Sequence, residues 1–248
     1  MSTFKFKMAS KLSAMSLLAA ACVLGPSGTV YAQDMSNDTV LFAGVDAREK
    51  AHYPYLGVIH HFSGDTLASG FLARIVGYQV QYEYDTTAVP SGSVDGDASL
   101  LEIMGGYQKV YESFTLRGYS GLDYEYHDLS PNNRFDANSG SHVGGKIQGE
   151  FETDFFAPNY VGVIATYGSA VDRYWARARA GRVFHGIVVG PEVLTKGDRE
   201  YNEQRIGAFL LFRNLAPALL TVSAGAADAG DSRGGHSPYI SVEVSTTF

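Results

Sequence analysis

Apolar and polar residues alternate along the stretch "SPYISVEVSTTF" at the end of the chain. Ile240, Val242 and Val244 share one parity, and Phe248 continues it to the last residue. Polar residues fill most of the positions between them, and Thr246 is the one weak position in the apolar row. A period of two is typical of an extended strand with unlike faces. This segment is therefore predicted to be a strand with one apolar face.

The same alternation predicts strands along most of the chain. No stretch after residue 32 keeps a period of 3.6 residues over three turns, and none is apolar for long enough to predict a membrane-spanning helix. About twelve strands, each near ten residues long, follow one another at fairly even spacing. They are predicted at residues 39–48, 53–62, 67–84, 99–111, 114–127, 142–153, 160–169, 173–184, 187–195, 203–212, 218–227 and 238–248.

The connections between these strands alternate in length. The short ones include residues 63–65, 112–113, 153–159, 185–186 and 213–217. Several of the others are longer and rich in Gly, Asp, Asn or Ser, such as "DTTAVPSGSVDGDA", "DLSPNNRFDANSG", "KGDREYN" and "DAGDSRGGHS". Short turns on one rim and long loops on the other are typical of outer-membrane barrels. The fold predicted is an all-β transmembrane antiparallel barrel, with both termini toward the periplasm and the last strand paired with the first.

The facing of the predicted strands agrees with such a barrel. In 114–127, for example, Leu116 and Leu122 oppose Arg117 and Asp123. Charges on one parity avoid lipid, where a misplaced Arg at mid-bilayer costs roughly 2–4 kcal/mol. Aromatic residues near strand ends, namely Tyr82, Tyr84, Tyr111, Tyr124, Tyr126 and Phe184, are expected in the two aromatic girdles. The charges expected in the lumen are Glu102, Asp123, Glu125, Glu150, Glu152, Glu243, Arg117, Lys146, Arg173, Arg177, Arg179 and Arg205.

One predicted strand, 67–84, does not fit this rule. Arg74 shares a parity with Tyr78, Val80, Tyr82 and Tyr84. Two explanations remain open. Either Arg74 lies near a rim, or a β-bulge between Arg74 and Tyr78 resets the register.

Residues 1–32 have the pattern of a secretory signal peptide. Lys5, Lys7 and Lys11 precede an apolar run from residue 12 to 24, and Val30-Tyr31-Ala32 follows as the cleavage site. We expect export by the Sec pathway and a barrel domain over residues 33–248. Lipidation at Cys22 is the alternative, although "AAAC" lacks the Leu expected three positions before the Cys.

Composition excludes several classes of protein. Loss of a leader with three lysines and no acid takes the formal charge from -7 to about -10, which does not suit nucleic acid. Cys22 is the only cysteine, so the domain after the leader has no disulfide.

Sequence motifs for catalysis are absent. The chain has no G-x-S-x-G, H-E-x-x-H or P-loop pattern, so we expect no enzyme, no cofactor and no metal site. Adjacent residues of a strand face opposite ways, so His60 and His61 cannot share a metal. Asp123, Glu125 and His127 share one face and are interpreted as a hydrogen-bonded cluster at a rim, with an acid-base site as the alternative. Asp95-Gly96-Asp97, expected in a long loop, is interpreted as a solvated acidic turn, with weak Ca²⁺ binding as the alternative.

The lumen charges allow two interpretations. In the first, paired charges fill a narrow interior, because buried charges need partners. In the second, they line a path for a sugar chain, whose C–H faces stack on aromatic rings while Arg and carboxylates bind its hydroxyls. The residues proposed for the second interpretation are Trp175, Arg177, Arg179, Tyr119, Arg117 and Glu150.

The order of several short segments resembles a known family. "FAGVDA" opens the first strand and "GDTLASGFLARIVGYQVQYEYD" follows, then "GGYQ", "GLDYEYHD" and "GGKIQGEFET". "VVGPEV" precedes "YNEQRIGAF", and "SAGAADAGDSRGGHSPYISVEV" closes the chain. This order resembles the BcsS-type cellulose biosynthesis proteins of Gram-negative bacteria. The resemblance implies an outer-membrane component of a cellulose synthesis and secretion system, and it supplies no catalytic residues.

The function predicted is an accessory role in cellulose export or display, by binding or guiding and without covalent chemistry. The partners expected are outer-membrane lipid, cellulose or another β-glucan, and components of the cellulose synthase complex. A small porin is the first alternative. An outer-membrane lipid-modifying hydrolase that uses His127 or a nearby Ser such as Ser130 is the second, and a soluble β-sandwich is the third.

Overall fold

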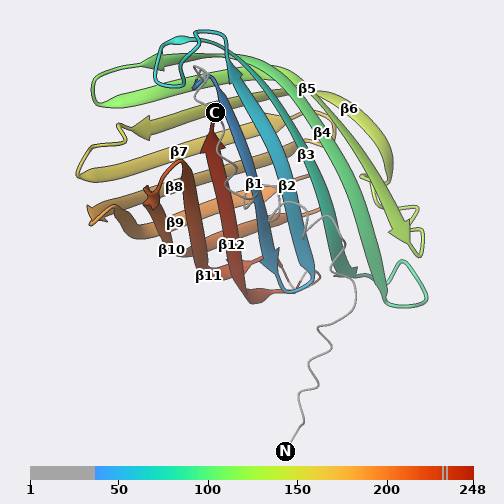
Figure 1. The fold of residues 1–248 in the computed structure, drawn as a ribbon. Coiled ribbons are helices and arrows are strands. Elements are labelled where there is room, and N and C mark those ends of the chain that lie inside the picture. The colour runs from blue at the N-terminus through green and yellow to red at the C-terminus, as the bar shows by residue number, and fades with distance from the viewer. Residues whose placement is uncertain (1–36, 231, 233) are drawn as a thin grey trace, which may run out of the picture. The chain divides into compact units, whose positions relative to one another are not determined.

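The structure, a computed structural model, is an antiparallel β-barrel (Figure 1). It describes residues 37–248 apart from 231 and 233. The predicted signal peptide, 1–32, and the alternative lipidation site at Cys22 lie outside the described residues. No helix among the described residues is long and apolar enough to cross a membrane.

Each strand pairs with its neighbours in sequence, and β1 pairs with β12 to close the barrel. Thr39 and Phe248 exchange both backbone hydrogen bonds, with N···O distances of 3.1 and 3.0 Å. The twelve predicted strands are confirmed, and the boundaries of two of them agree to the residue. The strands are β1 (Thr39–Arg48), β2 (Ala51–His61), β3 (Gly70–Asp85), β4 (Ser93–Val110), β5 (Phe114–Ser130), β6 (Gly140–Thr153), β7 (Asn159–Gly168), β8 (Arg173–Phe184), β9 (Ile187–Gly197), β10 (Asn202–Leu215), β11 (Ala218–Asp228) and β12 (His236–Thr247).

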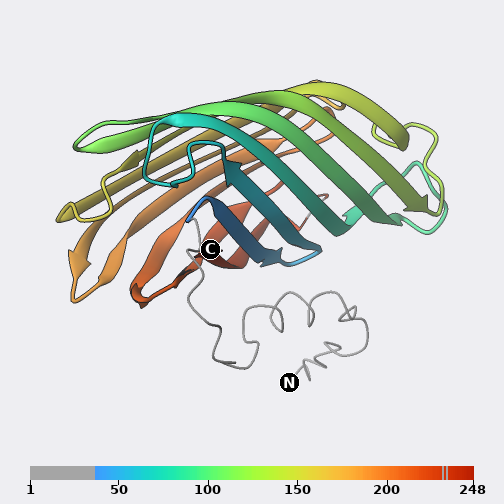
Figure 2. The same cartoon turned by 45° about the horizontal axis from the view of Figure 1, so that its top comes forward.

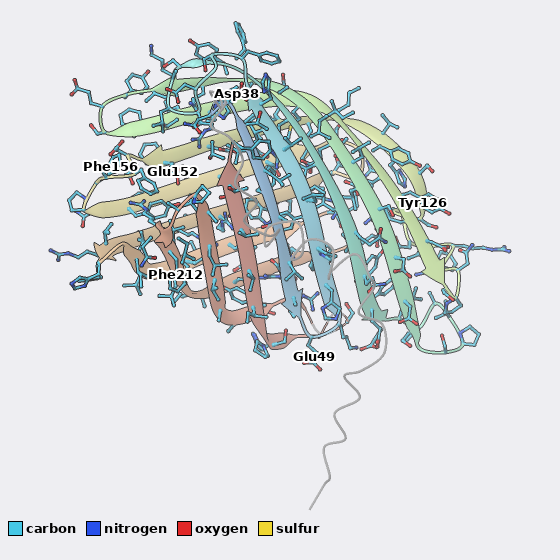
Figure 3. All side chains as sticks on the ribbon, viewed as in Figure 1. Asp38, Glu49, Tyr126, Glu152, Phe156 and Phe212 are labelled. Carbon is cyan, nitrogen blue, oxygen red and sulfur yellow. The ribbon has the colours of Figure 1, made fainter. Side chains whose placement is uncertain are left out.

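Alternation along the strands separates an apolar outer surface from a charged lumen. On β5, Leu122 is exposed while Asp123 and Glu125 are buried, as predicted. Tyr126 lies on the outer surface of the same strand (Figure 3). Hydrophobic residues are exposed on the outside of many strands, including Leu56, Ile75, Ile103, Leu122, Val143, Ile147, Val193, Ile206 and Ile240. An apolar band around a closed barrel is what a bilayer requires of strands that cross it.

The barrel has two rims. We call the rim that contains Thr39 and Phe248 the terminal rim, and the opposite one the distal rim. At the distal rim, one side of the barrel wall is higher than the rest. Strands β3, β4 and β5 have 16, 18 and 17 residues, and they reach past their shorter neighbours (Figures 1 and 2). On β6, pairing with β7 ends at Lys146, so residues 140–145 extend beyond the paired part of β7. We call this part of β3–β6 the tall wall.

The outer face of the tall wall turns polar above the apolar band. Ser99 Oγ donates to Gln79 Oε1 at 2.8 Å, and Gln81 Nε2 donates to Asp97 Oδ1 at 3.0 Å. These cross-strand pairs lie beyond Ile75 on β3 and Ile103 on β4. The change in polarity marks where the strands leave the hydrocarbon layer.

The tall wall also changes two of the predictions for loops. Asp95 and Asp97 lie on β4 and not in a long loop, because β3 and β4 stay paired up to Asp85 and Ser93. The connection expected to be short at 63–65 extends over 62–69, between β2 and β3. The Gly and acidic residues of the tall wall are typical of a loop sequence, although cross-strand pairing holds them in the sheet. The two rims therefore differ less in loop length than predicted.

Arg74 needs neither of the two explanations offered for it. The register between β3 and β4 is unbroken, so no bulge intervenes. Arg74 faces the lumen, and Tyr78, Val80, Tyr82 and Tyr84 face it with Arg74. The prediction of Tyr82 and Tyr84 in the girdle is therefore wrong, because the tall wall needs a small core of its own at the distal rim. That core contains Tyr84, Val89, Val94 and Leu129. Tyr111, Tyr124, Tyr126 and Phe184 are exposed, as expected for girdle residues.

Arg74 belongs to a buried charge cluster that joins three strands. Its Nη1 lies 2.8 Å from Glu102 Oε2, and Lys146 Nζ donates to the other oxygen of Glu102. All three side chains are less than a tenth exposed. Asp123 is buried on the neighbouring strand, and both of its oxygens lack a hydrogen-bond partner. One carboxylate thus balances two cations that face the inside of the barrel.

A charge placed on the lipid face should destabilise the barrel. We expect Leu122→Arg to lower the free energy of unfolding by about 2–4 kcal/mol, because Leu122 lies within the apolar band. Asp128→Arg is the matched control, since Asp128 lies on the same face of β5 above the band. Denaturant unfolding in lipid vesicles measures both. Equal effects of the two variants would contradict the assigned band.

Loss of the charge on Glu102 should leave two buried cations without a partner. We expect Glu102→Gln to lower the free energy of unfolding by about 3–5 kcal/mol. The control is Glu83→Gln, because Glu83 is half-exposed and lies 3.6 Å from Lys50. A further replacement of Lys146 by Met should recover part of the loss. The interpretation fails if Glu102→Gln and Glu83→Gln unfold at the same denaturant concentration.

Candidate functional site

The lumen is the candidate site, and clusters of paired charges cross it. Near the terminal rim, Arg117 donates to Gln108 Oε1 at 2.6 Å. Its Nη1 also lies 3.3 Å from Glu150 and 3.4 Å from Glu152. The strands β4, β5 and β6 supply these side chains. Arg117 and Glu150, both predicted as site residues, therefore form one ion pair.

A second cluster contains Arg179, another predicted site residue. Arg179 Nε donates to Glu192, and its Nη2 donates to Ser223 Oγ at 2.9 Å. Tyr239 donates to the other oxygen of Glu192 at 3.0 Å. This cluster joins β8, β9, β11 and β12, and its members are buried. Each hydrogen bond occupies an atom that a ligand would otherwise use.

A third cluster lies toward the distal rim. Arg205 Nη1 donates to both oxygens of Asp46, at 2.8 and 2.7 Å, and its Nε donates to Glu203. Arg48 reaches the same Glu203 at 2.7 Å, and Lys196 Nζ lies 3.6 Å from it. All twelve charges predicted to face the lumen do so, and most lie in clusters of this kind.

Trp175 and Arg177 differ from the other predicted site residues. The guanidinium of Arg177 lies 5.2 Å from the centroid of the Trp175 ring on the same strand, β8. Among the described residues, Arg177 makes no hydrogen bond or ion pair. The nearby Glu243 instead accepts a hydrogen bond from Tyr55 at 2.5 Å. These two side chains therefore retain capacity to contact a ligand.

The six predicted site residues form two groups. Trp175, Arg177 and Arg179 lie on β8, while the other three lie on β5 and β6. The structure gives no hydrogen bond, ion pair or ring contact between the two groups. Tyr119 is 4% exposed, and its hydroxyl has no hydrogen-bond partner.

The residues named for a lipid-modifying hydrolase do not meet. His127 faces the lumen, where its Nε2 lies 3.0 Å from Glu125 and its Nδ1 lies 3.3 Å from the Tyr82 hydroxyl. Ser130 has the opposite parity on β5 and is exposed. His60 and His61 also face opposite ways, as predicted. Over the described part of the chain, no three His, Cys, Asp or Glu residues are grouped to hold a metal.

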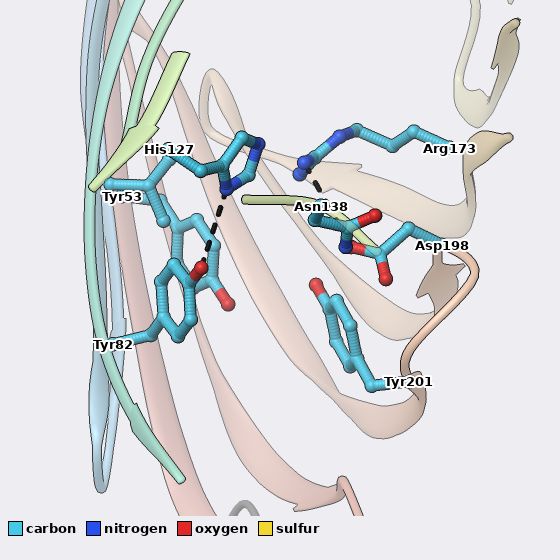
Figure 4. A pocket seen from close by; sticks show the side chains of 8 residues that line it. Tyr53, Tyr82, His127, Asn138, Arg173, Asp198 and Tyr201 are labelled. Carbon is cyan, nitrogen blue, oxygen red and sulfur yellow. Dashed lines mark hydrogen bonds and ion pairs between the residues drawn. The ribbon is translucent and has the colours of Figure 1, made fainter. Parts of the chain in front are cut away.

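A pocket at the distal rim was not predicted. The residues that line it come from segments that are distant in sequence, so no spacing of residues along the chain indicates this pocket. Strands β2, β3, β5 and β8 contribute to it, with the loops at 131–139 and 198–201. Figure 4 shows polar atoms of these side chains converging on one space. The lining residues are Tyr53, Val80, Tyr82, His127, Asn138, Arg173, Asp198 and Tyr201.

The loop at 131–139, between β5 and β6, folds over this pocket. Asp136 accepts a hydrogen bond from Tyr84 at 2.7 Å, and Asn133 donates to the same hydroxyl at 3.0 Å. The backbone N–H of Ala137 donates to Glu200 Oε1 at 3.1 Å. Since Glu200 lies between β9 and β10, this contact carries the loop across the mouth of the barrel.

Three solved structures have a related architecture. The KdgM porin in complex with disordered oligogalacturonate is 10% identical, with a TM-score of 0.44, over 84% of this chain and 99% of that chain. The outer-membrane protein OpdK from Pseudomonas aeruginosa is 9% identical, with a TM-score of 0.38, over 85% and 97%. CdiB from Acinetobacter baumannii is 9% identical, with a TM-score of 0.37, over 84% and 60%. At these values the likeness is one of barrel architecture alone.

The sequence comparison is more specific. No curated protein shows significant similarity to this chain. The family model for the cellulose biosynthesis protein BcsS matches residues 40–248. This match extends from the first residues of β1 to the end of the chain. It confirms the family resemblance that the order of the short sequence segments predicts. The chain belongs to the BcsS family of cellulose biosynthesis proteins.

Proposed function

We propose that this protein is an outer-membrane accessory factor of cellulose production that binds or guides glucan without covalent chemistry. Family membership over residues 40–248 carries the link to cellulose. The Sec pathway exports the chain by the leader at 1–32, and the distal rim faces the outside of the cell. Cellulose or another β-glucan and components of the cellulose synthase complex are the partners.

The paired lumen supports a role in binding over a role as an open conduit. A glucan chain passing along the barrel axis would have to separate ion pairs such as Arg179–Glu192 and Arg74–Glu102. Breaking a buried pair costs about 3–5 kcal/mol, because each partner is left without compensation. The loop at 131–139 presents a further barrier at the distal rim. We therefore assign glucan contact to the mouth and to accessible lumen residues.

Within the lumen, Trp175 and Arg177 are the predicted residues best suited to sugar contact. The indole offers an apolar face, and the guanidinium has donors that no described side chain accepts. Arg179, Arg117 and Glu150 act in the proposal by fixing the shape of the site through their own pairs. Tyr119 contributes a buried hydroxyl without a partner.

Removal of the protein should lower the amount of cellulose at the cell surface. We expect a deletion strain to lose cellulose several-fold in dye-binding and acid-hydrolysis assays, with recovery when the wild-type chain is supplied. The accessory role predicts normal synthase activity in isolated inner membranes of the same strain. An unchanged amount of cellulose in the deletion strain would contradict the proposed function without affecting the assignment of the barrel fold.

The porin alternative makes a different prediction in planar bilayers. A lumen crossed by paired charges should conduct ions poorly, so we expect the purified barrel to give little current. A variant lacking residues 132–137 tests whether the loop alone closes the mouth. The paired lumen predicts low conductance for that variant too. Large, stable channels from the wild-type protein would favour the porin.

A further inference from the structure

The loop at 131–139 closes the distal mouth without an apolar anchor. Its three buried residues, Asn133, Asp136 and Asn138, are all polar, whereas Phe135 is 83% exposed. Hydrogen bonds therefore hold the loop in place. Each such bond contributes little to the net free energy of the contact, because water replaces the partner when the contact opens.

Two other loops at the same rim are anchored differently. The loop between β3 and β4 buries Val89 in the small core of the tall wall. The connection between β7 and β8 buries Ala170 and Val171, which are 6% and 0% exposed. Apolar burial makes these two segments costly to move. Among these three loops, only the one at 131–139 can leave the barrel without carrying buried apolar side chains into water.

Two sets of hydrogen bonds fasten the loop at 131–139. On the tall wall, the Tyr84 hydroxyl donates to Asp136 and accepts from Asn133. Across the mouth, the N–H of Ala137 donates to the carboxylate of Glu200. We call the contact between Ala137 and Glu200 the latch. Both of its residues are exposed, so water competes for the latch.

The closed position leaves a buried polar atom unsatisfied. Asn138 is 3% exposed, and no described group donates to its Oδ1. The space beside it, next to Arg173 and Asp198, has a volume of about 10 Å³ (Figure 4). Such a space holds one water molecule at most. Opening of the loop would bring the amide oxygen of Asn138 to bulk water, so this side chain favours the open position.

Gly140 lies where the loop enters β6. Its φ is +93°, and a Cβ added there would meet no atom within 4 Å. Glycine adopts this left-handed region at little cost and changes its backbone angles readily. Hinges consist of a few residues at the ends of elements that absorb such changes. Gly140 therefore gives the loop a point at which to turn.

We propose that the loop at 131–139 is a lid, that the structure shows its closed position, and that it opens by releasing Tyr84 and Glu200. For its ligand the inference rests on the proposed function, because an open lid gives a glucan access to the lumen around Trp175 and Arg177. The lid itself does not depend on the identity of that ligand. The ion pairs deeper in the barrel stay formed in both positions, so the lid regulates binding and not passage.

Cross-linking of the latch tests the proposal. Cys22, the only cysteine of the chain, precedes the barrel domain. Ala137→Cys combined with Glu200→Cys therefore allows a short bismaleimide with a cleavable disulfide to join the two sides. The readout is the quenching of Trp175, the only tryptophan, by acrylamide. We expect cross-linking to slow quenching severalfold, and cleavage of the linker to restore the rate of the unlinked double variant.

Single substitutions test the two sets of hydrogen bonds. We expect Tyr84→Phe and Glu200→Ala each to speed quenching about fivefold to tenfold, because loss of a hydrogen bond lowers the closed-to-open ratio by about that factor. Tyr124→Phe and Glu49→Ala are the matched controls. Tyr124 is exposed on the outer face of β5, and Glu49 lies in the turn between β1 and β2 at the same rim. Both controls should be quenched at the wild-type rate.

Three results would overturn the lid. These are a quenching rate that cross-linking leaves unchanged, equal rates in the lid and control variants, or binding of cellohexaose by the cross-linked barrel at wild-type affinity. Heat-dependent gel mobility verifies that each variant is folded. Glu200→Ala and the cross-link keep the test valid if Tyr84→Phe disturbs the tall wall.

Failure of the lid and failure of the proposed function are distinguishable. If the deletion strain loses cellulose while all variants are quenched equally, the lid fails and the proposed function stands. If cross-linking slows quenching while the deletion strain keeps its cellulose, the lid stands and the proposed function fails.

Discussion

The hydrogen bonds between β1 and β12 are the constraint on which the rest of the structure depends. In a bilayer, a backbone group without a partner costs several kcal/mol, so a sheet crosses only if it closes. Closure gives every strand one lipid face and one inner face. The charged residues of the crossing segments must then all share the inner face. Close contact makes them pair with one another, as Glu102 does with Arg74 and Lys146.

The paired charges of the lumen fit the proposed binding role better than the passage of a polymer. Each cluster draws on strands that are distant in sequence, as Arg205 on β10 does when it binds Asp46 on β1. Such contacts fix the cross-section of the barrel and fill it. A barrel filled in this way offers a firm support for the side chains at its mouth. Near the distal rim, for example, Glu125 holds Arg173 through two hydrogen bonds.

Strand positions and their facing were predictable from the sequence because each depends on residues within one segment. The period of two placed the strands, and the parity of Arg117, Asp123 and Glu125 identified the inner face of β5. The facing of Arg74 was harder to predict, because the residues of the same parity on β3 are mostly aromatic and suit either face. The tall wall was missed because its residues are polar on the outside. The pocket was out of reach, since Tyr53, Asn138 and Asp198 meet only through pairing and loop contacts between distant segments.

The unequal height of the wall sets a direction of approach. On the side of β3–β6 the sheet stands above the apolar band, whereas β1 and β2 meet there in a turn at Glu49 and Lys50. If the barrel binds a long polymer as proposed, the high side of the wall would block its approach, and the low side would leave the mouth accessible. Under the proposed function, the unequal rim would admit a fibre that runs along the cell envelope more readily than one that points straight out of it.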